Sequence, residues 1–285
     1  MRGHGYVGLA VMLSAEAALL AGQPLVGRWF TPIVWTGYVL FVDAVAARVT
    51  GWSYVTTHRI DGVLLALASI ACWWLFEWYN APRFWRGGGG ADAAGLWWQY
   101  HGMEPNLWLR RLGYDWAFAT IFPALFLTAA ILRASVFRGL RARPWRLSPP
   151  LLRWSTAAGA VMVVIPLVIV SSWLVPLVWI GWTLLLEPLN ARAGRPSWLA
   201  DLARGDASRL LALLIAGAVC GVLWEFWNYW ATTRWTYTVP YLGHLKVFEM
   251  PVLGYLGFPP FALECYAMYH WLRGRLGPSP AAPVI

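Results

Sequence analysis

Two stretches of sequence, ACWWLFEWYN at residues 71–80 and VCGVLWEFWN at 219–228, each carry a glutamate inside an apolar run rich in aromatic residues. Both contain a cysteine, a glutamate and an asparagine in the same order and spacing, namely Cys72, Glu77 and Asn80, then Cys220, Glu225 and Asn228. An ionisable side chain within hydrocarbon is costly, so its repetition in an apolar run points to a functional position.

The composition around these stretches is that of a membrane protein. Apolar residue types make up 59% of the 285 residues, charged types only 12%, and tryptophan alone occurs 22 times. A soluble domain of this size has too little interior to bury that much apolar surface. The same figures exclude disordered, collagen-like and disulfide-scaffold proteins. The three cysteines lie in apolar runs, so the sequence indicates neither a disulfide framework nor a cysteine zinc site.

We therefore expect an all-α membrane protein with about eight transmembrane helices, each long enough to cross a hydrocarbon core of about 30 Å. The expected spans cover residues 5–24, 29–48, 62–80, 112–132, 155–172, 175–192, 208–230 and 251–272. Glycines and prolines within 239–271 predict a broken or re-entrant entry to the last span.

The spans divide into a parallel tandem duplication of four-helix units. TPIVWTGYVLFVDAVAAR at 31–48 aligns with VPLVWIGWTLLLEPLNAR at 175–192, and Trp98-Gln-Tyr100 aligns with Trp235-Thr-Tyr237. Because four spans are an even number, we expect both units to enter the membrane in the same direction, related by a pseudo-twofold axis along the membrane normal. The expected divisions are 1–133 for the first unit with a glycine-rich insertion near 87–95, 134–154 for an arginine- and proline-rich cytoplasmic linker, 155–275 for the second unit and 276–285 for a flexible tail.

The formal charge of +9 is interpreted as a topology signal, because the basic residues lie between apolar segments and form no single patch for nucleic acid. With the N-terminus inside, about two thirds of the 22 basic residues fall on the cytoplasmic side. We expect a multi-pass protein of the cell inner membrane with both termini in the cytoplasm, membrane lipids as partners and no nucleic-acid partner. Two acid–base pairs near the cytoplasmic ends of spans are interpreted as interfacial salt bridges, Asp43 with Arg48 and Glu187 with Arg192.

The repeated Glu-x-x-Asn is the candidate site, because residues three apart share one face of a helix and present a carboxyl group beside an amide. We assign Glu225 and Glu77 as candidate catalytic residues. The candidate substrate-binding residues are Asn228, Asn80, Asp115, Glu264, Trp224, Trp227 and Trp78. Two other interpretations stay open: protonated glutamates that hold helices together, and tryptophans that form the aromatic belt at the membrane interface.

The sequence carries no cofactor motif: it has no Walker loop, dinucleotide glycine motif, HExxH or GxSxG. We predict no cofactor and leave a divalent metal open, with His244 and Glu249 as the candidate ligands.

The Trp-Glu pair at 224–225, within an aromatic-rich helix, resembles the integral-membrane terpene cyclases. The resemblance covers a few residues of one helix and implies that the acid protonates an epoxide or alkene. Aromatic faces around such an acid would stabilise a cationic intermediate by cation–π attraction.

Three functions are consistent with these features. The first is an enzyme acting on a lipid or isoprenoid within the bilayer, by carboxylate general acid/base chemistry of the cyclase, isomerase or hydratase type, so that a hydrophobic small molecule is its ligand. The second is a small proton- or cation-coupled transporter. The third is a non-catalytic membrane assembly or interaction protein.

Overall fold

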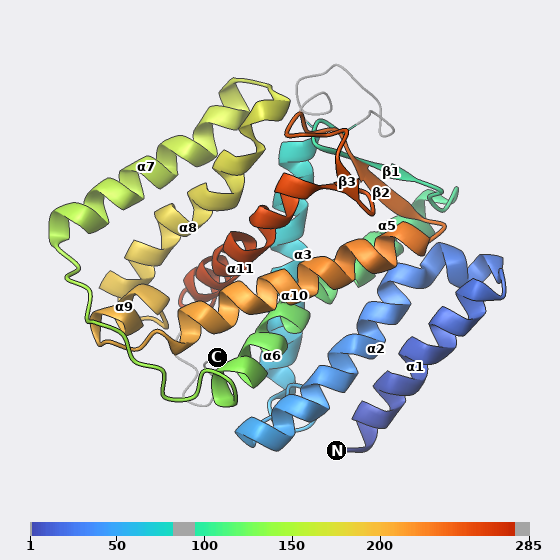
Figure 1. Cartoon of the computed structure of the whole chain (residues 1–285), viewed down its shortest axis with the longest axis horizontal. Helices are drawn as coiled ribbons and strands as arrows, with labels where there is room; N and C mark the ends of the chain where they lie inside the picture. Colours follow the sequence, from blue (N-terminus) through green and yellow to red (C-terminus); the bar gives the residue numbers. More distant parts are fainter. Residues whose placement is uncertain (1, 82–94, 277–285) are drawn as a thin grey trace.

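The computed structural model describes residues 2–81 and 95–276, where the chain forms a helical bundle with two short pairs of strands (Figure 1). Seven helical segments in these ranges are long and apolar enough to cross a membrane. They are α1 (Gly3–Leu20), α2 (Pro24–Thr50), α3 (Arg59–Asn80), the joined α5 and α6 (Leu107–Ala134), α7 (Pro149–Val168), the joined η1 and α8 (Ser172–Arg192) and α10 (Ser208–Trp230). These helices confirm the expectation of a helical protein with several membrane-spanning segments.

Two expected spans are interrupted. The expected span 112–132 corresponds to two helices, α5 (Leu107–Ala119) and α6 (Ile121–Ala134), which meet at Thr120. The expected span 251–272 begins as a 3-10 helix, η2 (Val252–Gly257), and continues as the shorter α11 (Phe258–Arg273). Glycine and proline account for this irregular entry, because they favour turns and interrupt helices.

The remaining described elements are short. They are the 3-10 helix η1 (Ser172–Leu174), α9 (Trp198–Ala203) and the strands β1 (Trp98–His101), β2 (Arg234–Tyr237), β3 (Lys246–Val247) and β4 (Met250–Pro251); α8 itself is Val175–Arg192. These strands are two to four residues long, and the other described elements are helical, consistent with the expected all-α membrane class. The expected glycine-rich insertion near 87–95 and the expected tail 276–285 lie outside the described residues, apart from Gly95 and Leu276.

Helices α1 and α2 form one hairpin, and α7 and α8 form another on the opposite side of the bundle (Figure 1). Each hairpin closes on a pair of glycines. A Cβ atom on Gly8 would lie 2.5 Å from the carbonyl oxygen of Gly37, and one on Gly159 would lie 2.7 Å from that of Gly181. Only glycine allows backbones to approach this closely, as is common where membrane helices pack.

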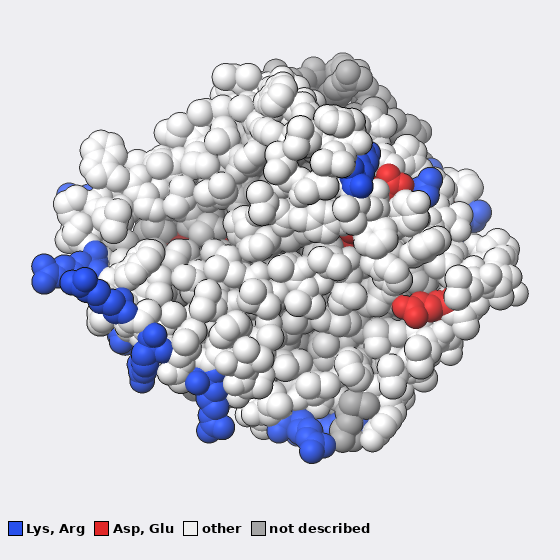
Figure 2. Space-filling view, in the orientation of Figure 1, with Lys and Arg blue, Asp and Glu red and all other residues white. Residues whose placement is uncertain are grey.

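Between the hairpins lie α3, α6, α10 and α11, which form the centre of the bundle. Helix α6 packs against α2 and α10, whereas α11 packs against α8 and α10. We call the end that carries β1 and β2 the strand end. Figure 2 shows that most visible Lys and Arg side chains lie along the opposite border, over the loops that follow α6 and α8, which we call the arginine-rich end.

Two buried acids hold loops at the arginine-rich end. Asp43 accepts a hydrogen bond from Ser53 Oγ at 2.5 Å, and Glu187 accepts one from Ser197 Oγ at 2.7 Å. Each acid also accepts a backbone N–H, from Tyr54 in the loop after α2 for Asp43 and from Leu199 at the start of α9 for Glu187, and both acid side chains are fully buried. The expectation of snorkelling salt bridges at the interface is therefore wrong for both pairs, Asp43 with Arg48 and Glu187 with Arg192. A buried acid is stabilised by such converging donors.

The strand register predicts a disulfide. Gln99 and Thr236 are direct partners in the ladder of β1 and β2. Directly opposed residues have Cα atoms about 4.5–5.5 Å apart, within the range of a disulfide. The double variant Gln99→Cys with Thr236→Cys should therefore crosslink under mild oxidation, measured as a mobility shift on a non-reducing gel.

The matched control is Gln99→Cys with Arg234→Cys, which is two residues out of register. The native cysteines can stay, because all three are buried. Equal crosslinking of the two pairs would contradict the register.

Candidate functional site

The site is built around a two-stranded antiparallel ribbon at the strand end. Its register pairs Trp98 with Tyr237, Gln99 with Thr236, Tyr100 with Trp235 and His101 with Arg234. Exchanging the two sequence-equivalent W-x-Y triplets leaves this pairing unchanged. Side chains alternate along a strand, so one face of the ribbon carries four aromatic rings, those of Trp98, Tyr100, Trp235 and Tyr237.

Two asparagines tie this ribbon to the ends of helices α3 and α10. Asn80 Oδ1 accepts the backbone N–H groups of Trp97 and Trp98 at 2.8 and 3.1 Å, and its Nδ2 donates to Trp98 O at 3.0 Å. Asn228 makes the same contacts with Trp235, whose N–H lies 2.9 Å from Oδ1 and whose carbonyl lies 2.8 Å from Nδ2. Both amides thus bind strand backbone, and their expected role in binding a ligand stays a prediction.

Three donors converge on one oxygen of Glu77. Its Oε1 accepts from Trp73 Nε1 at 3.0 Å, from Trp98 Nε1 at 3.1 Å and from the Tyr100 hydroxyl at 2.6 Å. Burial, and then the nearby charge of Glu77, raise the pKa of Tyr100 well above its usual range, so this hydroxyl keeps its proton and donates it. Glu77 is therefore anchored by its own strand.

Glu225 is held differently. Its Oε1 accepts from the Tyr237 hydroxyl at 2.8 Å, and that hydroxyl lies 2.8 Å from Trp235 Nε1. Because an indole N–H can only donate, the Tyr237 oxygen accepts from Trp235 and its single proton goes to Glu225. Burial, and then the charge of Glu225, raise the pKa of Tyr237 well above its usual range.

The other oxygen of Glu225, Oε2, is buried and has no hydrogen-bond partner among the described residues. The side chain as a whole is also fully buried. Since Oε1 is already an acceptor, a proton carried by Glu225 lies on Oε2. The carboxyl group is therefore oriented, with one oxygen held by Tyr237 and the other buried without a partner among the described residues.

One residue accounts for the difference between the two acids. Trp73, a donor to Glu77, aligns with Gly221, which has no side chain. The ring of Phe258 occupies that space, so that a Cβ atom on Gly221 would lie only 2.2 Å from Phe258 Cγ. Glu225 thereby lacks the indole donor from its own helix that Glu77 has.

A cavity of about 420 Å³ lies against this ribbon, within the size range of small-molecule sites. Glu225 lines the cavity, whereas Glu77 is not among its lining residues. All four ribbon aromatics also line it, together with rings from α2, α3, α8, α10 and α11, namely Trp35, Trp73, Trp179, Trp224 and Phe261. Most of the wall is therefore aromatic or aliphatic, with a single carboxyl group from α10.

The structure places the other candidate residues in different surroundings. Trp224 lines the cavity and packs against Trp35, with ring centroids 5.4 Å apart. Trp227 also packs on Trp35 but donates its Nε1 to Glu16 at 2.9 Å, and it is not among the lining residues. Trp78 is 40% exposed on the outside of the bundle.

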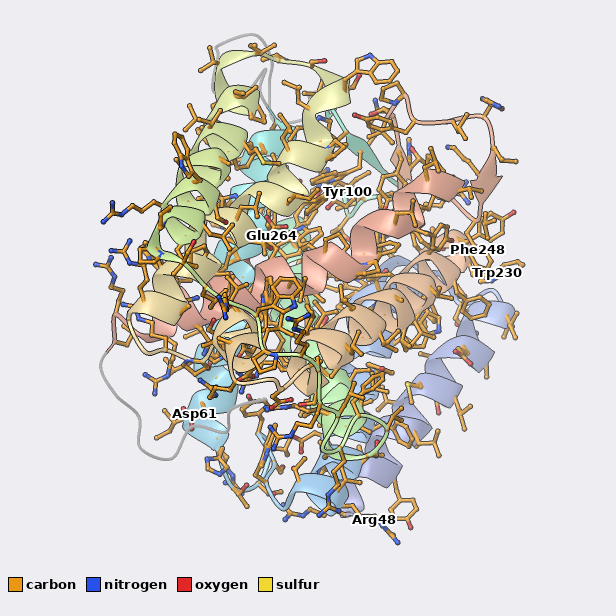
Figure 3. The ribbon with its side chains drawn as sticks, turned by 60° about the vertical axis from the view of Figure 1, so that its left-hand side comes forward. Arg48, Asp61, Tyr100, Trp230, Phe248 and Glu264 are labelled. Atoms are coloured by element: carbon orange, nitrogen blue, oxygen red, sulfur yellow. The ribbon has the colours of Figure 1, made fainter. Side chains whose placement is uncertain are left out.

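Two expected acids also lie away from the cavity lining. Asp115 accepts from Trp74 Nε1 at 2.6 Å and pairs with Arg111 at 3.2 Å. Glu264 lies near the middle of the bundle, farther from the strand end than Tyr100 (Figure 3). Its side chain is fully buried, and neither oxygen has a hydrogen-bond partner among residues 2–81 and 95–276. The structure therefore brings together Glu77, Glu225, Trp224 and the two asparagines, but not these acids.

The candidate metal ligands do not converge in the described ranges. His244 is exposed in the loop before β3, and Glu249 lies 3.8 Å from Arg234. Within the described ranges, no group of three or more His, Cys, Asp or Glu side chains is placed to hold a metal ion.

Sequence reasoning gave no role to Tyr100 and Tyr237, the hydroxyl donors to the two glutamates. The available signal was the repeated W-x-Y, which follows each Glu-x-x-Asn stretch. The W-x-Y triplets form one aromatic face only when the two strands pair, and the sequence alone does not show that pairing.

No family model matches the chain, and no curated protein or solved structure matches it. The function is therefore inferred from the site itself. Its geometry has two marks of a ligand site: an apolar cavity and a polar group with a fixed orientation.

The asparagine contacts predict a loss of stability. Asn228→Ala removes two hydrogen bonds to the backbone of β2 and should lower the free energy of unfolding by about 1–3 kcal/mol. The measurement is thermal unfolding in detergent, with the Gln99–Thr236 crosslink as a second readout that should weaken. The control is Asn106→Ala, because Asn106 caps the exposed start of α5 and does not contact the ribbon. An unchanged crosslink in Asn228→Ala would contradict the role of the amide.

Proposed function

We propose that this polytopic membrane protein is an enzyme that acts on a lipid or isoprenoid substrate within the bilayer, with Glu225 as its general acid. One observation carries the proposal: Glu225 Oε2 is buried without a partner among the described residues, and Glu225 lines an aromatic cavity. An apolar substrate offers few polar groups, so the protein has to orient the acid, and the hydroxyl of Tyr237 does so.

The reaction class follows from an acid among aromatic rings. The Oε2 proton adds to one carbon of a carbon–carbon double bond and leaves a carbocation on the other carbon. The faces of the lining tryptophans stabilise this cation. A neighbouring carbon then returns a proton to the Glu225 carboxylate, which completes an isomerisation. In a cyclisation, a second double bond of the substrate first attacks the cation, which forms the ring bond and moves the positive charge, and the proton is lost from a carbon next to the new cation. In a hydration, water adds to the cation instead, and the resulting oxonium oxygen returns a proton to the Glu225 carboxylate.

Glu77 has a different role in this proposal. It is outside the cavity lining, and three donors hold one of its oxygens. Such bonds are charge-assisted when the acceptor is ionised. Glu77 then anchors β1, whose aromatic face forms part of the cavity, and supports catalysis through position.

The proposal includes a tandem duplication of four-helix units. Three observations support it: the paired W-x-Y strands, the equivalent asparagine contacts with each strand, and the paired glycines in each helix hairpin. The equivalent loop-holding acids Asp43 and Glu187 add a fourth.

The proposed setting is the cell inner membrane, with the strand end facing outward and both termini in the cytoplasm. The gathering of arginines at the opposite end supports this orientation, because basic loops are retained in the cytoplasm (Figure 2).

A small proton-coupled transporter is the second candidate. Two equivalent carboxyl groups next to a strand ribbon that pairs two similar units favour it, because parallel repeats are common in transporters. The difference in hydrogen bonding between Glu77 and Glu225 favours the enzyme.

The enzyme proposal predicts that Glu225→Gln lowers turnover at least about 100-fold, because amides do not supply the proton. The measurement is mass spectrometry of apolar small molecules that co-purify with the protein or accumulate in membranes of expressing cells. The wild type should enrich a product, and Glu225→Gln its precursor.

The matched control is Glu264→Gln, which removes a buried acid that does not line the cavity and should leave the product pattern intact. Identical compounds in the wild type and Glu225→Gln would contradict the enzyme. A ligand-induced pH change in proteoliposomes would then identify the transporter.

A further inference from the structure

The loop between α6 and α7, residues 135–148, carries four arginines and no acidic residue. The four, namely Arg138, Arg141, Arg143 and Arg146, are all exposed. None of their side chains makes a hydrogen bond, an ion pair or a ring contact with another described residue. The loop therefore presents four guanidinium groups that an anion from outside the protein can reach.

The acids that lie opposite this loop already have basic partners. The loop contacts α9 and the turn that follows it, which carry Asp201 and Asp206. Arg133 Nη2 lies 3.2 Å from Asp206 Oδ2, and Arg209 Nη1 lies 2.5 Å from Asp201 Oδ2. Asp201 pairs with Arg204 as well. Two carboxylates thus have three arginines as partners, and the positive charge of the loop is left over.

The backbone of the loop is fixed against the rest of the bundle. Ala142 donates its N–H to the carbonyl of Gly205 at 3.0 Å, and Trp145 donates its N–H to that of Leu202 at 3.0 Å. Gly205 has a φ of +77°, and a Cβ atom there would lie only 2.9 Å from the Ala142 oxygen. A binding surface whose backbone is already ordered loses less conformational entropy when a ligand binds.

The loop lies at the level of the lipid headgroups. It joins the end of α6 at Ala134 to the start of α7 at Pro149, and both helices belong to candidate membrane spans. Trp145 in the loop is 54% exposed, and Trp154 on α7 is 75% exposed. Tryptophan is enriched where hydrocarbon meets headgroups. Figure 2 shows the basic side chains of this border on the surface of the molecule.

We propose that Arg143 and Arg146 bind the headgroup phosphate of an anionic phospholipid, with the ring of Trp145 against its glycerol and upper acyl chain. An open hollow lies among these side chains, and it is lined by Arg143, Pro144, Trp145 and Arg146. Guanidinium groups have a planar set of N–H donors that matches phosphate oxygens. This inference goes beyond the proposed reaction and does not rest on it.

The exposed indole of Trp145 favours a lipid over a soluble anion as the occupant. A free phosphate ion would leave this ring in water, whereas a phospholipid covers its apolar face. An anionic leaflet also concentrates negative charge where the loop lies, which strengthens binding by about fivefold for each arginine near the surface. A zwitterionic headgroup has no net charge and gains less from the same arginines.

The test is native mass spectrometry of the full-length protein in a non-ionic detergent, titrated with phosphatidylglycerol or with phosphatidylcholine of the same acyl chains. We expect the first phosphatidylglycerol to bind about tenfold more tightly than phosphatidylcholine. The double variant Arg143→Gln with Arg146→Gln should remove this preference. Trp145→Ala should weaken the binding of both lipids, because the ring contacts the part that they share.

The matched control is Arg48→Gln with Arg192→Gln, which removes the same charge from two exposed arginines at the ends of α2 and α8. This control should keep the preference for phosphatidylglycerol. Thermal unfolding without added lipid shows whether each variant is folded. The variant Arg143→Lys with Arg146→Lys keeps the charge and should retain part of the preference, so it tests the site independently of the glutamine variant.

An equal loss of preference in the loop variant and in the control would overturn the site and leave only general charge attraction. Unchanged lipid binding in Trp145→Ala would overturn the contact with the indole. Displacement of phosphatidylglycerol by inorganic phosphate or by hexaglutamate at the same concentration would overturn the lipid as occupant and assign the loop to a soluble anion or an acidic peptide. The product pattern of Glu225→Gln tests the enzyme separately from all of these outcomes.

Discussion

The hydrogen bonds between two buried asparagines and a strand ribbon organise the strand end of this protein. Extended backbone next to hydrocarbon is stable only when its N–H and C=O groups have partners. The two strands supply partners to each other, and Asn80 and Asn228 supply them at the helix ends. This fixes which face of the ribbon turns toward the helices, and that face carries the rings that line the cavity.

Two similar settings produce two different carboxyl groups. Glu77 has three donors on one oxygen, because its own helix adds the indole of Trp73. Glu225 has glycine at the equivalent place, and the ring of Phe258 fills the space. An apolar ring replaces a hydrogen-bond donor, and this leaves Glu225 facing the cavity with an oxygen that the described protein does not engage.

The length of the apolar segments predicted the membrane class and the main helices. The Glu-x-x-Asn pattern predicted the two acids that accept hydrogen bonds from the ribbon tyrosines. The donors to those acids could not be predicted, because the strand pairing joins Trp98 to Tyr237, which lie about half the chain length apart in sequence. The sequence also did not reveal which aromatic side chains face the cavity. Trp73 and Trp78 both lie near Glu77 on α3, yet Trp73 lines the cavity and Trp78 is exposed on the outside. The loop partners of Asp43 and Glu187 were missed because nearby arginines suggested a simpler pairing.

The register of β1 and β2 is unchanged when the two W-x-Y triplets are exchanged, and this symmetry suggests how such a chain could have evolved. Under the proposed duplication, each strand finds in the other unit the partner that an identical strand would provide, since the register pairs Gln99 with Thr236 at its centre. A lone four-helix ancestor with this strand would leave a sheet edge unpaired and could close it with a second copy of itself, as a twofold homodimer. Fusion of two such genes would keep the dimer interface inside one polypeptide. It would also free one copy to lose a tryptophan while the other retained it.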